Sequence, residues 1–253
     1  MIDDLVYNGR NLRSLGFELK DEQFFTVAKR RKELIDALGA DGAELLDNEG
    51  YENVEMNYNI NSDPYVLWDK SNDEIAHNLI DWLCIGDGTY RVLRDTYNPG
   101  YYTYATPINP QLISCFAEGA LDTTISFSRK PYWYSDLGTS PRVYTPNVTD
   151  ATVEINNPEM YSSKPYIKIT TAAAFKITVN GDTSHSLTVA GVTQYVEIDS
   201  ESYDVHAGST DFNDSTTGNY LPILKPGKNT IRVESLGNKN IEEIEIVPRW
   251  RRL

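Results

Sequence analysis

The sequence predicts a mainly β protein, with an N-terminal β domain that contains one helix and a C-terminal β-sandwich. Two observations support this prediction. Short segments of alternating apolar and polar residues recur along the chain, which is typical of half-buried strands. Beyond residue 135 such segments follow one another at roughly ten-residue spacing with turns between them, as in a sandwich.

The N-terminal half contains three clear strand candidates. Residues 12–19 form a short candidate after an Asn8-Gly9 turn. Residues 54–60 alternate Val, Met, Tyr and Ile with polar residues, and residues 121–127 alternate in the same way. Alternation of this kind predicts strands with one face in the core and one in water.

One helix is predicted after residue 71. Ser71 and Glu74 have capping-box spacing, in which the serine hydroxyl accepts from a backbone N–H of the first turn. The apolar residues that follow share one helical face: Ile75, Leu79, Trp82 and Leu83. We expect Gly86 and Gly88 to end the helix.

Residues 24–38 allow two interpretations, a helix or the long arm of a hairpin. They contain the dense basic run 29–32, Lys-Arg-Arg-Lys. Such a run is most often a solvated face. The functional alternative is an arm that pairs with the acidic surface of a neighbouring subunit.

The domain boundary is predicted near Tyr134, giving domains 1–134 and 135–253. Pro141 and Pro146 lie in a stretch rich in Ser, Thr, Gly and Asp, which interrupts the strand pattern. Residues 175–179 then alternate towards Asn180-Gly181, a strong hairpin signal. Later strands are expected around residues 196–198, 231–233 and 244–246, with no helix after residue 135.

Composition limits the possible classes of function. The 253 residues are 40% hydrophobic, enough for a core, and no apolar run reaches membrane-spanning length. We expect no signal peptide, and we interpret Cys84 and Cys115 as small buried hydrophobic residues in a reducing cytoplasm. A net charge of −14 argues against binding to a nucleic-acid backbone. It suits a conduit that repels DNA, although most acidic proteins are simply acidic.

The sequence contains no motif typical of an enzyme. Nucleophile elbows, phosphate-binding loops and dinucleotide fingerprints are absent, and His77, His185 and His206 lack metal-ligand spacing. We therefore predict no enzyme activity and no catalytic, cofactor-binding or metal-binding residues. The aromatic cluster 132–134 suits an interdomain hinge better than a sugar-binding platform.

Several segments, taken with their order and spacing along the chain, resemble one known family. In the N-terminal half they are Asn11 to Phe17, the Trp82-Leu83 helix, Tyr90 to Leu93, Tyr97 to Tyr102, and Phe127 to Pro131. In the C-terminal half they are Asn157-Pro158, Pro165 to Ile169, Val179 to Gly181, Glu197 to Ser200, Pro226 to Asn229, and Pro248 to Trp250. Together these segments resemble the distal tail protein family of long-tailed, non-contractile bacteriophages (siphophages).

This resemblance implies a fold and a role. The fold would be an N-terminal β domain with a helix, followed by a galectin-like β-sandwich, the last residues returning towards the first domain. Six N-terminal domains would form a ring, the hub of the tail tip, with a central channel through which DNA passes without sequence-specific binding. The expected partners are five other copies, the tail tube protein, the tail-associated tip protein and a receptor-binding or baseplate protein. The protein would be made in the host cytoplasm and would reside in the virion, without membrane insertion.

Two other functions remain open at this stage. A carbohydrate-binding adhesin would act through the C-terminal sandwich. A tail-tube subunit would also be a β-rich protein that assembles into a ring, but this function would leave the second domain unexplained. The sequence also departs from the family at residues 27–33, where many relatives have a short Val-Pro-Gly-Arg-like stretch. The shape of the intersubunit arm is therefore left open by the resemblance.

Overall fold

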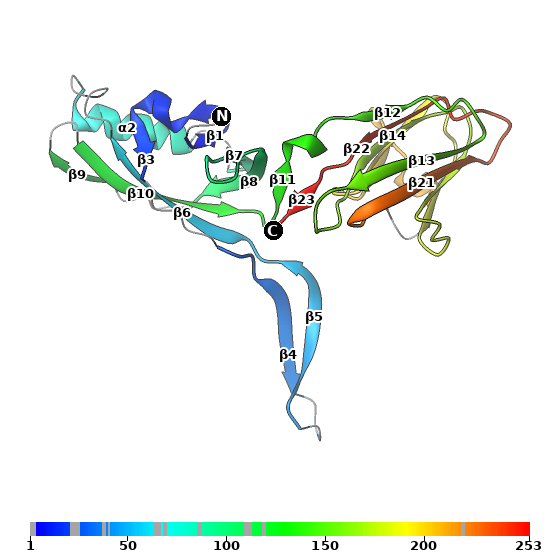
Figure 1. The fold of residues 1–253 in the computed structure, drawn as a ribbon, viewed down its shortest axis with the longest axis horizontal. Helices are drawn as coiled ribbons and strands as arrows, with labels where there is room; N and C mark the ends of the chain where they lie inside the picture. Colours follow the sequence, from blue (N-terminus) through cyan, green and yellow to red (C-terminus); the bar gives the residue numbers. More distant parts are fainter. Residues whose placement is uncertain are drawn as a thin grey trace. The chain divides into compact units, whose positions relative to one another are not determined.

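A computed structural model describes residues 4–20, 26–36, 39, 41–62, 67, 70–84, 88–108, 113–117, 120–218 and 221–253 of the chain (Figure 1). The chain divides into two compact units. The first comprises residues 1–133 together with Leu253, and the second comprises residues 134–252. About half of the described residues of each unit lie in strands and few lie in helices, so the predicted mainly β class is confirmed.

The first unit is built on one antiparallel sheet. Its strands run in the order β2-β1-β7-β8-β10-β6-β3, with β9 paired to β10. Their bounds are β1 Val6–Tyr7, β2 Arg10–Asn11, β3 Phe17–Leu19, β6 Val54–Ser62, β7 Arg91–Arg94, β8 Tyr101–Pro107, β9 Ile113–Ala117 and β10 Ala120–Arg129. A separate two-stranded sheet is formed by β4 (Arg30–Asp36) and β5 (Ala43–Tyr51), and β11 (Trp133–Ser135) lies at the boundary of the units.

The predicted helix is α2 (Asn72–Cys84). The backbone N–H of Glu74 donates to Ser71 Oγ over 3.2 Å, so the predicted serine cap is confirmed. The four expected apolar residues are buried, and the Trp82 ring meets Tyr7 edge-to-face at 5.9 Å in the core. The expected end of the helix at Gly86 lies outside the described residues.

Two local predictions are wrong. Residues 12–19 were expected to be one strand, but Leu12–Leu15 is a 3-10 helix and only Phe17–Leu19 is a strand. The Asn11 side chain accepts from the backbone N–H of Arg13, and Gly16 ends the turn at φ 81°, a left-handed conformation that glycine favours. Cys84 was expected to be buried, but it is an exposed free thiol at the end of α2.

The second unit is a sandwich of two antiparallel sheets. One has the order β12-β22-β14-β17-β18-β19 and the other the order β13-β21-β15-β16-β20. The bounds are β12 Arg142–Tyr144, β13 Asp150–Asn157, β14 Tyr166–Thr170, β15 Phe175–Val179, β16 Ser186–Val189, β17 Tyr195–Asp199, β18 Asp204–Ala207, β19 Thr210–Asp211, β20 Thr216–Thr217, β21 Gly227–Ser235 and β22 Glu243–Val247. Two 3-10 turns lie at Asp136–Gly138 and Asn213–Ser215, and β23 is Arg251–Arg252.

The sandwich core follows from strand alternation. Strand β13 alternates exposed and buried residues along its whole length, and β14, β17 and β22 alternate partly exposed and buried residues. Inward side chains of both sheets form one cluster that includes Ile167, Phe175, Val233 and Trp250. Asn180 and Gly181 form the predicted turn after β15, both with positive φ.

Candidate functional site

The feature of the first unit that most needs explanation is the β4–β5 arm. Figure 1 shows the two strands as a separate ribbon that continues beyond β6. Within the segment left open by the sequence, Arg30–Asp36 is therefore one strand of a hairpin arm. Every residue of β4 is exposed. An isolated two-stranded hairpin is marginally stable in water, so an arm of this kind is expected to gain stability by packing against something else.

Apolar side chains lie on both faces of the arm. Leu34 pairs directly with Leu45, and because paired residues share a face, these two leucines lie together. Ile35 and Leu46 occupy the alternate positions and therefore lie on the opposite face. Leu34 is 70% exposed and Leu45 is 56% exposed. An exposed apolar strand pair is a typical site of protein association.

Hydrogen bonds from one buried side chain, that of Arg129, fix the chain just before the arm. Arg129 is 2% exposed, and its guanidinium donates to the backbone carbonyls of Thr26, Lys130 and Pro131. Burial lowers the pKa of Arg129 to about 10, so the group stays charged at neutral pH. The buried guanidinium therefore fixes the chain just before β4 to the end of β10.

The basic run is partly neutralised by the arm itself. Arg30 pairs with Asp47 at 2.5 Å, and Lys29 pairs with Glu52 at 3.7 Å. Exposed pairs of this kind add little stability. Among the described residues no ion pair is found for Arg31 or Lys32. These two side chains remain compatible with either earlier interpretation, a solvated face or a contact with an acidic neighbour.

The three histidines are held by carboxylates or backbone. His77 contacts the carbonyl of Asp73 at 2.8 Å, and His185 contacts Asp182 at 2.6 Å. His206 lies between Glu197 at 2.9 Å and Asp204 at 3.0 Å. In the described part of the chain no group of His, Cys, Asp and Glu is arranged to hold a metal ion.

Nor does any described helix have the length and apolar character needed to cross a membrane.

Two of the three residues of the aromatic cluster 132–134 do not offer a binding platform. Trp133 and Tyr134 are almost fully buried. The guanidinium of Arg129 lies 5.3 Å from the Trp133 ring centroid, and the Tyr134 hydroxyl donates to Glu201. A stacked sugar needs an accessible ring face, and these two rings have none.

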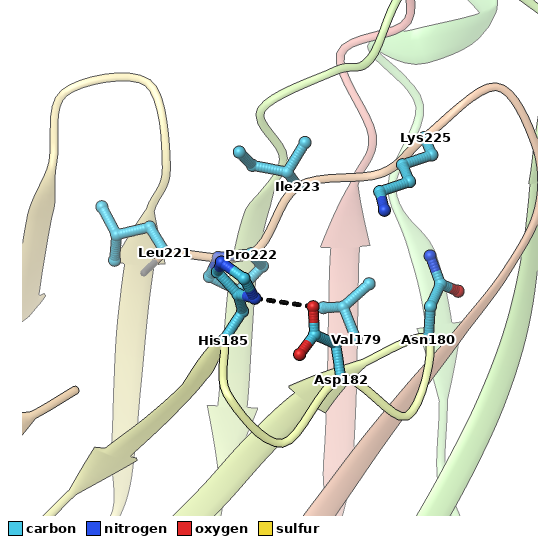
Figure 2. Close-up of a pocket in the computed structure, with 8 residues that line it drawn as sticks. All are labelled: Val179, Asn180, Asp182, His185, Leu221, Pro222, Ile223 and Lys225. Atoms are coloured by element: carbon cyan, nitrogen blue, oxygen red, sulfur yellow. Dashed lines mark hydrogen bonds and ion pairs between the residues drawn. The ribbon is translucent and has the colours of Figure 1, made fainter. Parts of the chain in front are cut away.

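Among the described residues, two cavities that each lie within one unit are considered as ligand sites. The larger, about 460 Å³, is in the second unit between the turn after β15 and the segment 221–225 (Figure 2). The smaller, about 190 Å³, is in the first unit and is lined by Asp4, Arg13, Glu18 and Lys20 among others. Asp4 is buried there, and burial raises the pKa of its carboxyl. The residues of both cavities come from separate segments of sequence.

Comparison with solved structures shows which fold this is. The chain superimposes on the crystal structure of the SPP1 Dit (gp 19.1) protein with a TM-score of 0.67, over 96% of this chain and 97% of SPP1 Dit. The chain has the fold of SPP1 Dit. Because sequence identity is only 15%, the similarity establishes the fold alone. The sequence matches no protein-family model and has no curated relative at a significant level of similarity.

The shared fold agrees with the fold that the resemblance found in the sequence implies. SPP1 Dit is described as a paradigm of the hub adsorption apparatus in phages that infect Gram-positive bacteria. The similarity covers both units, since almost the whole of each chain is aligned. The sequence alone did not determine whether residues 24–38 are an arm or a helix, because the residues that pair with them are 43–51.

Proposed function

We propose that this protein is a structural subunit of a siphophage tail tip, in which six copies close into a ring that forms the hub. The observation that carries this proposal is the shared fold with SPP1 Dit, a hub adsorption protein, over nearly the full length of both chains. A match confined to one unit would support only a common β module. The full-length match supports the same architecture of two units in one chain.

The exposed arm supports closure into a ring. A closed cyclic assembly needs a heterologous interface, in which one patch meets a different patch on the next copy. The arm offers two apolar faces on a projecting hairpin, and Leu34 with Leu45 forms the larger exposed pair. In the proposed ring the arm packs on the first unit of the neighbouring copy and its leucines are buried there.

The charge of the chain suits a conduit for DNA. The net charge is −14, and a ring of six acidic subunits repels a polyanion that passes through its centre. Transit without binding requires that phosphates find few clustered cations. We propose that the channel is formed by the first units, and that DNA passes through it without sequence-specific contact.

The remaining roles follow from the hub proposal. The ring would join the tail tube protein on one face and the tail-associated tip protein on the other. The second units, proposed to be galectin-like sandwiches, would point outward and hold a receptor-binding or baseplate protein. The protein would have no enzymatic activity, would be made in the host cytoplasm and would be part of the virion.

Light scattering after size exclusion tests this proposal. Measured over a range of concentrations, the main peak should have six times the 28.6 kDa chain mass, either alone or after mixing with tail tube or tip protein. A ring that forms only with a partner would mean that assembly is templated on the growing tail. A monomer under all these conditions would contradict the hub and favour the carbohydrate-binding adhesin.

A further inference from the structure

The larger cavity of the second unit is lined by two kinds of side chain (Figure 2). The aliphatic ones are Val179, Leu221, Pro222 and Ile223. The polar ones are Asn180, Asp182, His185 and Lys225. At about 460 Å³ the cavity is within the usual size range of ligand sites, which combine apolar walls with a few placed polar groups.

A buried asparagine fixes the two sides of this cavity to each other. The Oδ1 atom of Asn229 accepts from the backbone N–H of Lys225 at 2.9 Å and from Nδ2 of Asn180 at 2.9 Å. Its Nδ2 donates to the carbonyls of Lys225 and Gly227 at 2.7 and 2.9 Å. Asn229 is 1% exposed, so the amide uses all its hydrogen-bonding capacity inside the protein. The cavity is therefore preformed.

The polar side chains of the cavity include one positive charge for which no ion pair is found within the described residues. Asp182 accepts from the hydroxyl and backbone N–H of Ser184 and lies 2.6 Å from the imidazole of His185. Hydrogen bonds lower the pKa of Asp182, and the one from the Ser184 hydroxyl has the largest effect. Lys225 is exposed, and no ion pair is found for its ammonium within the described residues. An anion that enters the cavity meets this ammonium, while the carboxylate of Asp182 is already engaged.

We propose that this cavity binds a segment of a partner polypeptide in which an aliphatic side chain stands beside a carboxylate. The aliphatic side chain packs on Leu221 and Ile223, and the carboxylate pairs with the ammonium of Lys225. The lining residues include no Trp, Tyr or Phe, the large rings on which a sugar usually stacks. The proposal concerns the second unit alone and does not depend on ring assembly.

Methyl-detected NMR of the full-length protein tests the proposal with a synthetic peptide. The probe is acetyl-Gly-Leu-Glu-Gly-amide, and its neutral twin has Gln in place of Glu. The expected result is a shift of the methyl signals of Val179, Leu221 and Ile223 by the probe. The neutral twin should bind about three-fold more weakly, the size expected for one exposed ion pair. Added salt should weaken the probe and leave the twin nearly unchanged.

Three variants separate the contribution of the ion pair to peptide binding from that of the apolar contact. Lys225→Gln should reduce the affinity for the probe to that of the neutral twin, and Ile223→Ser should weaken both peptides. Lys228→Gln is the matched control, because Lys228 is exposed, pairs with Glu154 at 2.8 Å and does not line the cavity. It should leave binding unchanged.

Four results would overturn the proposal. The first is that the probe shifts no methyl signal up to its solubility limit, and the second is that the probe and its neutral twin bind equally well. The third is that methyl glycosides shift these signals and the probe does not. The fourth is that the same signals change with protein concentration in the absence of peptide, since a second copy of the chain would then be the occupant.

Discussion

The guanidinium of Arg249 binds both carboxylate oxygens of Asp199, at 2.6 and 2.9 Å, although the two residues are 50 positions apart. The pair holds the segment after β22 against the end of β17. Arg249 has a φ of 53°, and its backbone N–H donates to the carbonyl of Gly138 at 2.9 Å. A non-glycine residue in this left-handed conformation is strained, so the ion pair and the backbone bond together stabilise it.

This pair predicts acid-dependent stability. Burial raises the pKa of Asp199, but hydrogen bonds from Arg249 and from backbone N–H groups outweigh it and lower the pKa to about 2. Because the folded pKa lies below the usual 3.8, the stabilisation is present above about pH 4 and is lost as the pH falls towards 2. Asp199→Asn should reduce the free energy of unfolding by about 2 kcal/mol at pH 7 in urea titrations.

The control for this prediction is Asp150→Asn. Asp150 also binds an arginine through two contacts, Arg232 at 2.6 and 2.8 Å, but at an exposed position. Its loss should cost less than about 1 kcal/mol. A large effect of Asp150→Asn combined with a small effect of Asp199→Asn would contradict the account.

The first unit has a buried polar pair of its own. The Tyr58 hydroxyl donates to the fully buried carboxylate of Asp95 at 2.7 Å, and burial raises the pKa of Tyr58 well above its usual value. Tyr58→Phe leaves that oxygen of Asp95 without its donor and should cost about 1–3 kcal/mol in thermal or urea unfolding. Tyr203→Phe, at an exposed tyrosine, should change stability by less than about 0.5 kcal/mol.

Asn229, the buried asparagine beside the larger cavity, should contribute strongly to the free energy of unfolding although it is polar. Asn229→Ala removes four hydrogen bonds and leaves the backbone groups of Lys225 and Gly227 without these partners. We expect a loss of about 2–4 kcal/mol, measured by urea unfolding. Asn240→Ala removes one exposed amide contact, to Asn147 at 3.2 Å, and should be nearly neutral. Equal stability of the two variants would contradict this role for Asn229.

The arm should matter for assembly and not for the fold of one chain. Leu34→Ser with Leu45→Ser should leave monomer stability within about 0.5 kcal/mol, because both side chains are exposed. The same change should abolish or strongly weaken the hexamer in light scattering, since the proposed interface loses its apolar pair. Val143→Ser, an exposed apolar site of the second unit, serves as the control and should assemble normally. Normal assembly of the double variant would exclude the arm as the ring interface.

Elements specified by local sequence were predictable from the chain. The serine cap and one-sided apolar pattern of α2, and the alternation of β6 and β10, depend on residues that are near in sequence. The arm was ambiguous because Leu34 and Ile35 fit both a helix and a strand, and the decision depends on pairing with residues 43–51. Cys84 was misjudged because its exposure at the end of α2 depends on how the helix packs.

The cavity and the buried pairs could not be predicted. In the sequence Asn229 is only the last residue of a Pro-Gly-Lys-Asn stretch, and its side-chain hydrogen bond with Asn180 joins positions 49 residues apart. Asp199 likewise ends β17, whereas Arg249 lies after β22. Pairs of this kind are created by the fold, so the sequence gives no spacing from which to recognise them.

The most direct test of the central claim is electron microscopy of the purified protein in negative stain, with and without tail tube protein. The account predicts six-fold symmetric class averages with an open centre, and their loss in the Leu34→Ser, Leu45→Ser variant. Compact single particles without a ring in both samples would contradict the account.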